Sequence, residues 1–206
     1  MKYQNYIFDL GNVLVHFDPA AMTAAVVKDP ASAAQIMPVV FDRLYWDPLD
    51  SGDISDDALK AACRARLPAS LHALSDQVYD QWMENLTIIS GMPEILAQIR
   101  ALGGKLYLLS NVSTGFAEHY RDVPLLSALL SQFDGLVFSG QLKIVKPDIR
   151  IFQYLLDTFG LKAEETFFID DNAKNISGAE RAGIAGYVFD GDPQKLYHHL
   201  LLGEVK

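Results

Sequence analysis

The stretch "YIFDLGNVLVHFD", residues 6–18, decides the fold of this 206-residue chain. An apolar run ends abruptly at Asp9, and a Gly-Asn pair at residues 11–12 follows it. This pattern predicts a short buried strand over residues 3–9 that ends in a turn. A carboxylate at the end of a buried strand is costly unless it has a charged partner or a chemical task. Asp9 is therefore the first candidate for a site residue.

Beyond Gly91 the sequence alternates between helical and strand-like segments. We expect further strands over residues 105–111, 135–139, 166–170 and 185–189, with amphipathic helices between them. Five strands that alternate with helices are typical of a parallel sheet covered on both faces. The predicted fold is therefore α/β, a doubly wound (Rossmann-like) five-stranded parallel sheet, whose ligands bind beyond the carboxyl ends of the strands.

Residues 17–88 interrupt this alternation directly after the first strand. Apolar residues recur there at three- and four-residue spacing, which predicts helices over residues 18–29, 33–46, 56–67 and 75–86. We therefore expect a catalytic core made of residues 1–16 and 89–206, and an inserted helical cap made of residues 17–88.

The composition limits the compartment and the partners. The formal net charge of −9 argues against nucleic acid, whose phosphates need a basic footprint. Cys63 is the only cysteine, so no internal disulfide is possible and a reducing compartment is favoured. We see no signal peptide and no apolar stretch of the ~20 residues that span a bilayer. The expectation is a cytoplasmic protein without membrane partners, either a monomer or a homodimer.

Polar residues stand where the predicted strands end. The first strand ends at Asp9, the second at Ser110-Asn111 and the fourth at Asp170-Asp171, while Lys146 follows the third. In a doubly wound sheet these positions converge on one edge. Three carboxylates at one edge need a cation, and oxygen ligands suit Mg²⁺. Lys146 adds a compact positive charge, and hydroxyl and amide groups can bind phosphate oxygens.

This combination of groups is typical of phosphoryl transfer. A carboxylate beside a metal ion and a lysine can attack phosphorus and form an aspartyl phosphate, while the cations neutralise the transition state. Each residue also has an ordinary alternative when it is taken alone. Asp9 is compatible with a helix cap, Asp170-Asp171 with a solvated loop pair, and Lys146 with a routine loop lysine. Only their joint position at the strand ends favours the site.

Four short segments of the sequence resemble the motifs of a known family. In order, "FDLGNV", "LLSN", "KPD" and "FFIDDN" resemble the four motifs of the haloacid dehalogenase-like (HAD) hydrolase superfamily. The helical insert is similar to the helical cap of that superfamily. "FDLGNVLV" and "SGDIS" resemble its branch of small sugar-phosphate phosphatases, which includes alpha-glucose-1-phosphate phosphatase.

The resemblance implies a role for each matching position. Asp9 would be the nucleophile, and Lys146 would orient it and balance its charge. The implied Mg²⁺ ligands are Asp9, the backbone carbonyl of Gly11, Asp171 and, directly or through water, Asp170. The implied phosphate-binding residues are Ser110, Asn111 and Lys146, and Asn175 would support the metal ligands.

Gly11 departs from the family pattern. The commonest first motif carries a second carboxylate there, which protonates the leaving group and then activates water. A positioned acid–base group contributes roughly 100- to 10,000-fold to the rate, or about 3–5 kcal/mol of barrier. Three replacements are open: His16 in the turn after the first strand, a residue of the cap, or a substrate with an easy leaving group. We favour the last, because the anomeric hydroxyl of a sugar 1-phosphate is more acidic than an ordinary alcohol.

The remaining candidates lie in or beside the cap. Arg43, Tyr45 and Trp46 could face the substrate, although Tyr45 and Trp46 could equally pack between cap helices. His16 is an acid–base candidate, and a surface histidine after the first strand is the alternative.

The leading hypothesis is a Mg²⁺-dependent phosphatase for small phosphate monoesters, expected to be sugar phosphates. A 2-haloacid dehalogenase is the first alternative, since it would use the same aspartate without a metal. A non-catalytic protein that binds phosphometabolites is the second, and Gly11 is its only support.

Overall fold

The computed structural model describes residues 2–202. The position of the first strand decides which residue stands at the centre of the carboxyl edge of the main sheet. The strands of this sheet are parallel and lie in the order β5-β4-β1-β6-β7. Their bounds are β1 Asn5–Phe8, β4 Lys105–Ser110, β5 Gly135–Phe138, β6 Thr166–Asp170 and β7 Ala185–Val188. Because β1 is central, Asp9 stands in the middle of the carboxyl edge. The predicted doubly wound fold is confirmed, and the parts of the core prediction at residues 1 and 203–206 lie outside the described residues.

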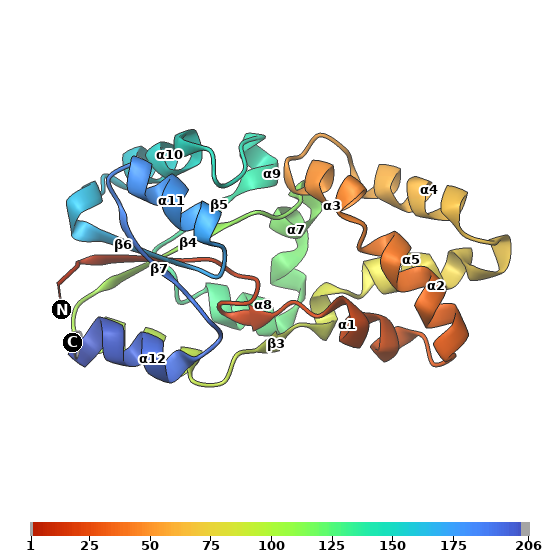
Figure 1. Cartoon of the computed structure of the whole chain (residues 1–206), viewed down its shortest axis with the longest axis horizontal. Helices are drawn as coiled ribbons and strands as arrows, with labels where there is room; N and C mark the ends of the chain where they lie inside the picture. The colour runs from red at the N-terminus through yellow and green to blue at the C-terminus, as the bar shows by residue number, and fades with distance from the viewer. Residues whose placement is uncertain (1, 203–206) are drawn as a thin grey trace.

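Helices cover both faces of the sheet (Figure 1). Side chains alternate along β1, so Tyr6 and Phe8 belong to one apolar cluster and Ile7 to the other. The first cluster includes residues of α6 Met92–Ala101, α8 Pro124–Leu130 and α12 Pro193–Tyr197. The second includes residues of α10 Ile149–Phe159 and α11 Ala173–Arg181. Strands buried on both faces read as near-continuous apolar runs, which is why the sequence revealed them.

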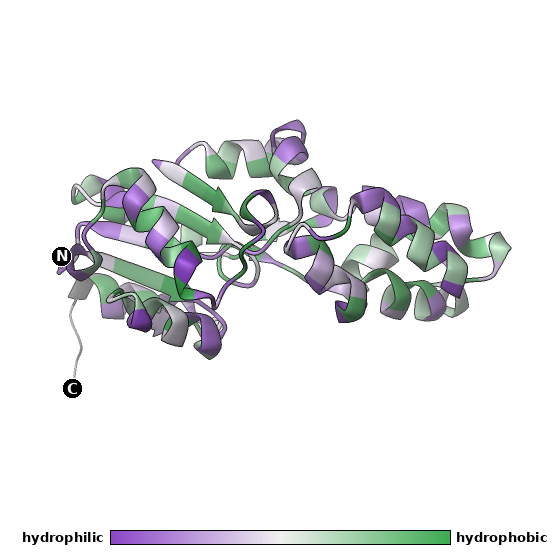
Figure 2. Ribbon diagram, turned by 90° about the horizontal axis from the view of Figure 1, so that it is seen from above, coloured by the Kyte–Doolittle hydropathy of each residue, from purple (hydrophilic) through white to green (hydrophobic). Residues whose placement is uncertain are grey.

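The remaining helices of this lobe are short. They are α7 Thr114–His119 and α9 Ser139–Leu142, and α12 continues as a π-helical turn over His198–Leu202. Viewed from above, the strands carry many hydrophobic residues, and the helices around them alternate between hydrophobic and hydrophilic residues (Figure 2). None of the helices within residues 2–202 has the length and apolar content to cross a membrane.

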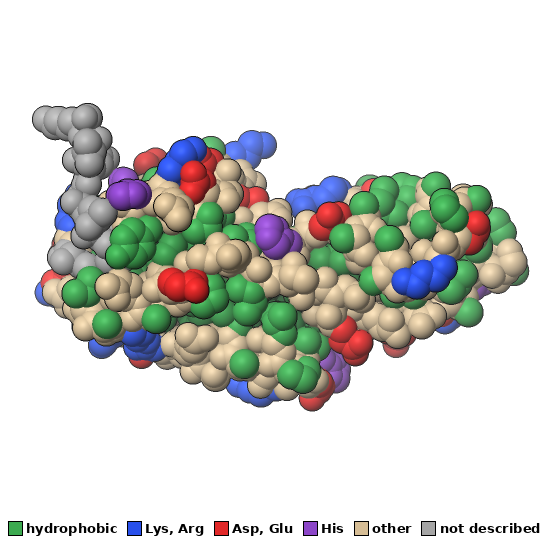
Figure 3. Space-filling view, turned by 90° about the horizontal axis from the view of Figure 1, so that it is seen from below, with side chains coloured by type: hydrophobic (Ala, Val, Ile, Leu, Met, Phe, Trp, Pro, Cys, Tyr) green, Lys and Arg blue, Asp and Glu red, His purple; other side chains and the backbone are tan. Residues whose placement is uncertain are grey.

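A helical bundle forms the second lobe, beyond the carboxyl ends of the strands (Figure 1). Its helices are α1 Pro19–Val26, α2 Pro30–Val40, α3 Arg43–Asp50, α4 Asp56–Arg66 and α5 His72–Asp80. The two lobes meet at a waist, which a notch in the upper outline marks in the space-filling view (Figure 3). The bundle lies within residues 17–88, the range that the sequence analysis expects to be an inserted helical cap.

One predicted cap helix is divided in two. The sequence pattern predicted a single helix over residues 33–46, but α2 ends at Val40 and α3 begins at Arg43. Asp42 lies between them and caps α3, since its Oδ1 accepts a hydrogen bond from the backbone N–H of Leu44 at 3.0 Å. The break separates α3 from α2, and α3 packs against α9 of the other lobe.

A two-stranded ribbon at the waist was not predicted. β2 Val15–His16 pairs antiparallel with β3 Thr87–Ile88, so both connections between the lobes run side by side. Two-residue strands are too short to give a periodic signal.

Candidate active site

A cavity of about 430 Å³ lies between the carboxyl edge of the sheet and the cap. Its floor comes from the strand ends and its roof from α3 and the waist. The floor includes predicted site residues, namely Asp9, Gly11, Ser110, Asn111, Lys146, Asp171 and Asn175. The roof includes Phe17, Arg43, Trp46, Asp50 and Trp82.

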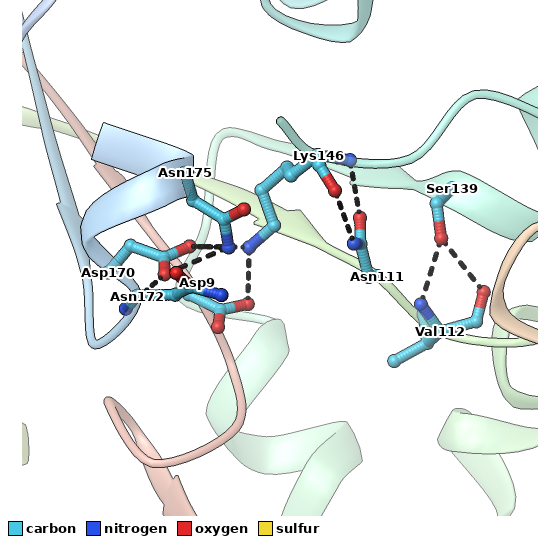
Figure 4. Close-up of polar contacts among 8 residues, drawn as sticks. All are labelled: Asp9, Asn111, Val112, Ser139, Lys146, Asp170, Asn172 and Asn175. Atoms are coloured by element: carbon cyan, nitrogen blue, oxygen red, sulfur yellow. Dashed lines mark hydrogen bonds and ion pairs between the residues drawn. The ribbon is translucent and has the colours of Figure 1, made fainter. Parts of the chain in front are cut away.

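Lys146 is the centre of the floor (Figure 4). Its Nζ lies 2.8 Å from Oδ1 of Asp9 and 2.7 Å from Oδ2 of Asp170, and its side chain is 1% exposed. Burial alone would lower the pKa of Lys146, but the charges of Asp9 and Asp170 outweigh burial and raise it. Lys146 is therefore a permanent cation between two carboxylates.

The backbone of Lys146 is held from two sides. Its N–H donates to Oδ1 of Asn111 at 2.9 Å, and Nδ2 of Asn111 donates to its carbonyl at 3.1 Å (Figure 4). On the other side, a Cβ atom at Gly178 would collide with the carbonyl oxygen of Pro147, so α11 packs closely against this loop. The side-chain amide of Asn111 thus positions Lys146, while Ser110 lines the cavity at the end of β4.

Asp170 is fully buried and fully partnered. Besides Lys146, it accepts hydrogen bonds from Nδ2 of Asn175 at 3.0 Å to each oxygen, and from the backbone N–H of Asn172 at 2.8 Å (Figure 4). Asn175 stands on the first turn of α11, so the helix that follows β6 fixes the last residue of that strand. The side chain of Asp170 therefore has a single orientation.

Three carboxylates meet beside Lys146. Asp9, Asp170 and Asp171 each offer an oxygen within 4.8 Å of the others. Burial raises the pKa of Asp9 to about 6, with Lys146 opposing the rise and Asp170 adding to it. Burial and the charge of Asp170 also raise the pKa of Asp171. One lysine does not neutralise three carboxylates, and oxygen ligands so close together fit a hard divalent cation such as Mg²⁺.

Two predicted residues lie away from the cavity. His16 is exposed on β2 and does not line it. Tyr45 is outside the lining too, and the guanidinium of Arg66 lies 5.3 Å from the centre of its ring. Arg43 and Trp46, by contrast, line the roof from α3.

The roof contains an aromatic cluster. The ring of Phe17 lies 5.6 Å from that of Trp46 and 5.9 Å from that of Trp82, and the two indoles are 5.6 Å apart. Trp46 therefore packs against other aromatic rings of the cap and also lines the cavity. The sequence had left open which of these two positions it would take.

Sequence reasoning missed several polar residues that line the cavity, among them Asn12 and Asp50. Asn12 has a left-handed φ of 55° and hydrogen-bonds Asp171, which offsets part of the rise in the pKa of that carboxyl. The Gly-Asn turn was a usable signal, because Asn tolerates this conformation. Asp50, the last residue of α3, carried no comparable signal in its sequence context.

Residues 3–183 match the family model of the haloacid dehalogenase-like hydrolases. The chain belongs to the haloacid dehalogenase-like hydrolase family. Its membership makes it a hydrolase, and its motif segments are those that meet at the floor of the cavity.

Relatives of this HAD-like hydrolase differ in reaction. It is 25% identical to sesquiterpene phosphatase astK of Aspergillus oryzae, over 87% of this chain and 86% of that protein. It is 28% identical to (S)-2-haloacid dehalogenase 4A of Burkholderia cepacia, over 66% of this chain and 57% of that protein. A HAD family enzyme of Bacteroides thetaiotaomicron, an aspartate-to-alanine mutant in complex with magnesium and inorganic phosphate, shares the fold with a TM-score of 0.69. It is 20% identical, and the match covers 95% of this chain and 99% of that one.

Proposed function

We propose that this protein is a Mg²⁺-dependent phosphatase that hydrolyses small phosphate monoesters through an aspartyl phosphate on Asp9. The observation that carries the proposal is the floor of the cavity, where Lys146 joins Asp9 to Asp170 beside a third carboxylate, Asp171. Dehalogenation displaces halide from carbon without a metal, so the same carboxylates would be surplus negative charge. The cluster therefore favours phosphoryl transfer over the dehalogenase alternative.

Each floor residue has a task in this reaction. Asp9, Asp170, Asp171 and the carbonyl of Gly11 would hold Mg²⁺, which when bound supplies positive charge for the phosphoryl oxygens. The carboxylate of Asp9 attacks phosphorus, and the bond between phosphorus and the leaving oxygen breaks. Lys146 orients Asp9 through its ion pair with Oδ1 and balances the charge that develops. Ser110 and the strand end around it would receive the phosphoryl group.

The proposed substrates are sugar phosphates, with sugar 1-phosphates preferred. A cavity of about 430 Å³ suits a small metabolite. The indole rings of Trp46 and Trp82 in its roof provide flat faces for a sugar ring, while Arg43 and Asp50 offer partners for hydroxyls. An anomeric leaving group also reduces the need for the carboxylate that Gly11 lacks.

We further propose that residues 17–88 act as a cap domain on a core of residues 1–16 and 89–206. The ribbon of β2 and β3 supports this division, because both connections cross between the lobes there.

The test is a panel of phosphate esters, including glucose 1-phosphate and glucose 6-phosphate, assayed for phosphate release with Mg²⁺ or EDTA. We expect Mg²⁺-dependent release, faster turnover of the 1-phosphate, and loss of activity in Asp9→Asn. Activity that survives EDTA or Asp9→Asn would falsify the mechanism, and equal rates for the two esters would remove the preference. Halide release from 2-chloropropionate would favour a dehalogenase, and Mg²⁺-dependent binding without turnover would favour a binding protein.

A further inference from the structure

Asp50 is a carboxyl group in the roof of the cavity, and its side chain has no partner among residues 2–202. It is the last residue of α3 and lines the same cavity as Asp9. Within residues 2–202 its carboxyl makes no hydrogen bond or ion pair with another residue, and Arg43 of the same helix is paired to Asp47 at 2.7 Å instead. The carboxyl is therefore free to interact with a bound molecule.

The core holds the backbone of Asp50 in place. Oγ of Ser139, which is fully buried at the start of α9, donates to the carbonyl of Asp50 at 2.6 Å. The same hydroxyl accepts from the backbone N–H of Val112 at 2.9 Å, directly after the Ser110-Asn111 strand end (Figure 4). One buried hydroxyl thus connects the end of the cap helix to the predicted phosphate-binding end of β4.

A close backbone contact lies two residues further on. Gly52 has a φ of +71°, and a Cβ atom there would collide with the carbonyl oxygen of Gly140. The segment that contains Asp50 is therefore docked on the core, and its place above the floor does not depend on a loose loop.

The surroundings of Asp50 favour its protonated form. Burial raises its pKa well above the usual range, and the charges of Asp47 on α3 and Asp9 after β1 add to the rise. Arg43 on α3 and Lys146 before α10 oppose it. A neutral carboxyl group can donate a proton, and a half-buried carboxyl with a raised pKa at the wall of the cavity is suited to general acid–base catalysis.

Among residues 2–202, no other carboxyl or imidazole group that lines the cavity is free for this task; Lys174 also lines it, but that side chain is exposed to solvent. Gly11 has no side chain, His16 is exposed outside the cavity, and the other three carboxylates are engaged in the floor. We propose that Asp50 is the general acid and base of this hydrolase, and that it carries out from the cap the proton transfers that Gly11 cannot. This inference rests on the proposed phosphatase function.

The proton balance closes over two steps. As Asp9 attacks phosphorus, the bond to the leaving oxygen breaks with its electron pair, and that oxygen takes the proton of Asp50. Asp50 is left as a carboxylate. It then takes a proton from water as the water oxygen attacks the phosphorus of the aspartyl phosphate. Asp9 leaves as a carboxylate, inorganic phosphate forms, and Asp50 is protonated again.

The test compares Asp50→Asn with the wild type on phenyl phosphate and 4-nitrophenyl phosphate in the presence of Mg²⁺. The two esters share a ring, but 4-nitrophenol is the more acidic alcohol and needs no protonation. We expect kcat/KM for phenyl phosphate to fall by about 100- to 10,000-fold, with a much smaller loss for 4-nitrophenyl phosphate. Because the variant lacks the base for the second step, we also expect a burst of one equivalent of 4-nitrophenol before slow turnover.

Two further variants make the result specific. Asp53→Asn is the matched control, since Asp53 is exposed three residues later and does not line the cavity. It should keep wild-type rates on both esters. Asp50→Glu restores a carboxyl and should recover part of the phenyl phosphate activity.

Equal losses on both esters without a burst, or no loss at all, would overturn the role of Asp50 while leaving the phosphatase function intact. A wild-type protein without Mg²⁺-dependent turnover of either ester would overturn the proposed function itself, and the role of Asp50 with it.

Discussion

The floor and the roof of the cavity differ in how their charged side chains are buried and paired. In the floor, Lys146 and Asp170 are buried and each charged group has a partner. In the roof, the side chain of Arg43 is 79% exposed and the carboxyl of Asp50 has no partner among the described residues. The floor stands on strand ends that cannot move independently, whereas Arg43, Trp46 and Asp50 of the roof all stand on α3. The difference suggests that the floor supplies chemistry common to the family and that the roof adapts it to a substrate.

Removal of the floor lysine should produce the largest effect on stability. Lys146→Met leaves the carboxylates of Asp9 and Asp170 buried without their cation. Breaking a buried ion pair by removing one partner costs about 3–5 kcal/mol, so we expect a loss of that size in the free energy of unfolding measured by urea denaturation at pH 7.

The control for this variant is Lys143→Met, three residues earlier. Lys143 is exposed, and a surface substitution of this kind should change the free energy of unfolding by no more than about 0.5 kcal/mol. Similar losses in the two variants would show that the ion pairs of Lys146 contribute little to the free energy of unfolding.

Metal binding is the next largest effect that we expect. Mg²⁺ at 100 times its dissociation constant should stabilise the wild type by about 2.7 kcal/mol, visible as a rise in Tm. Asp171→Asn should abolish most of this rise, because it removes one of the three clustered carboxylates. Asp157→Asn, a change on the exposed side of α10, should retain it. An unchanged response in Asp171→Asn would place the metal elsewhere.

The same contrast explains what could be predicted from the sequence. The floor residues follow strands whose apolar runs are visible locally, and parallel strands bring their carboxyl ends to one edge, so Asp9, Lys146 and Asp171 could be expected to meet. The hydrogen bonds by which the Asn111 side chain holds the backbone of Lys146 could not be predicted from the sequence. They depend on where a loop 35 residues later folds back.

The roof was less predictable because its position depends on tertiary contacts. Arg43 and Trp46 face the cavity only because the chain breaks before α3, and a periodic pattern ran through that break. Asp50 is held by the hydroxyl of Ser139, which is 89 residues away in the sequence. Neither contact leaves a local pattern in the sequence. The helical periodicity of residues 17–88 therefore predicted helices there, but not which of their side chains face the cavity.

A smaller effect is expected in the way the free energy of unfolding changes with pH, because of Asp9 in the floor. Because the pKa of Asp9 is raised from its usual value to about 6, the folded state holds a proton there that the unfolded chain has released. Without metal, this contribution is fully present below the usual pKa of 3.8, declines above it, and is lost as the pH rises through about 6. The free energy of unfolding of the wild type should therefore fall relative to Asp9→Asn, by up to about 1.4 kcal/mol per pH unit.

Urea denaturation in EDTA between pH 4 and pH 7 measures this difference. A pair of parallel profiles would mean that burial does not raise the pKa of Asp9 in the metal-free protein. Asp53→Asn serves as the control, because the exposed Asp53 should leave the wild-type profile unchanged.

The smallest effect on stability should come from the roof. Arg43 pairs with Asp47 across one helical turn, with side chains 79% and 55% exposed. Exposed pairs of this kind are worth about 0.3–0.5 kcal/mol, so Arg43→Gln should barely change the free energy of unfolding. If Arg43 binds substrate, the same variant should raise KM for glucose 1-phosphate while kcat stays near the wild-type value, because the floor chemistry is intact. A fall in kcat with an unchanged KM would contradict this prediction. It would mean that Arg43 on α3 acts in the chemical step, so that the roof does more than bind the substrate.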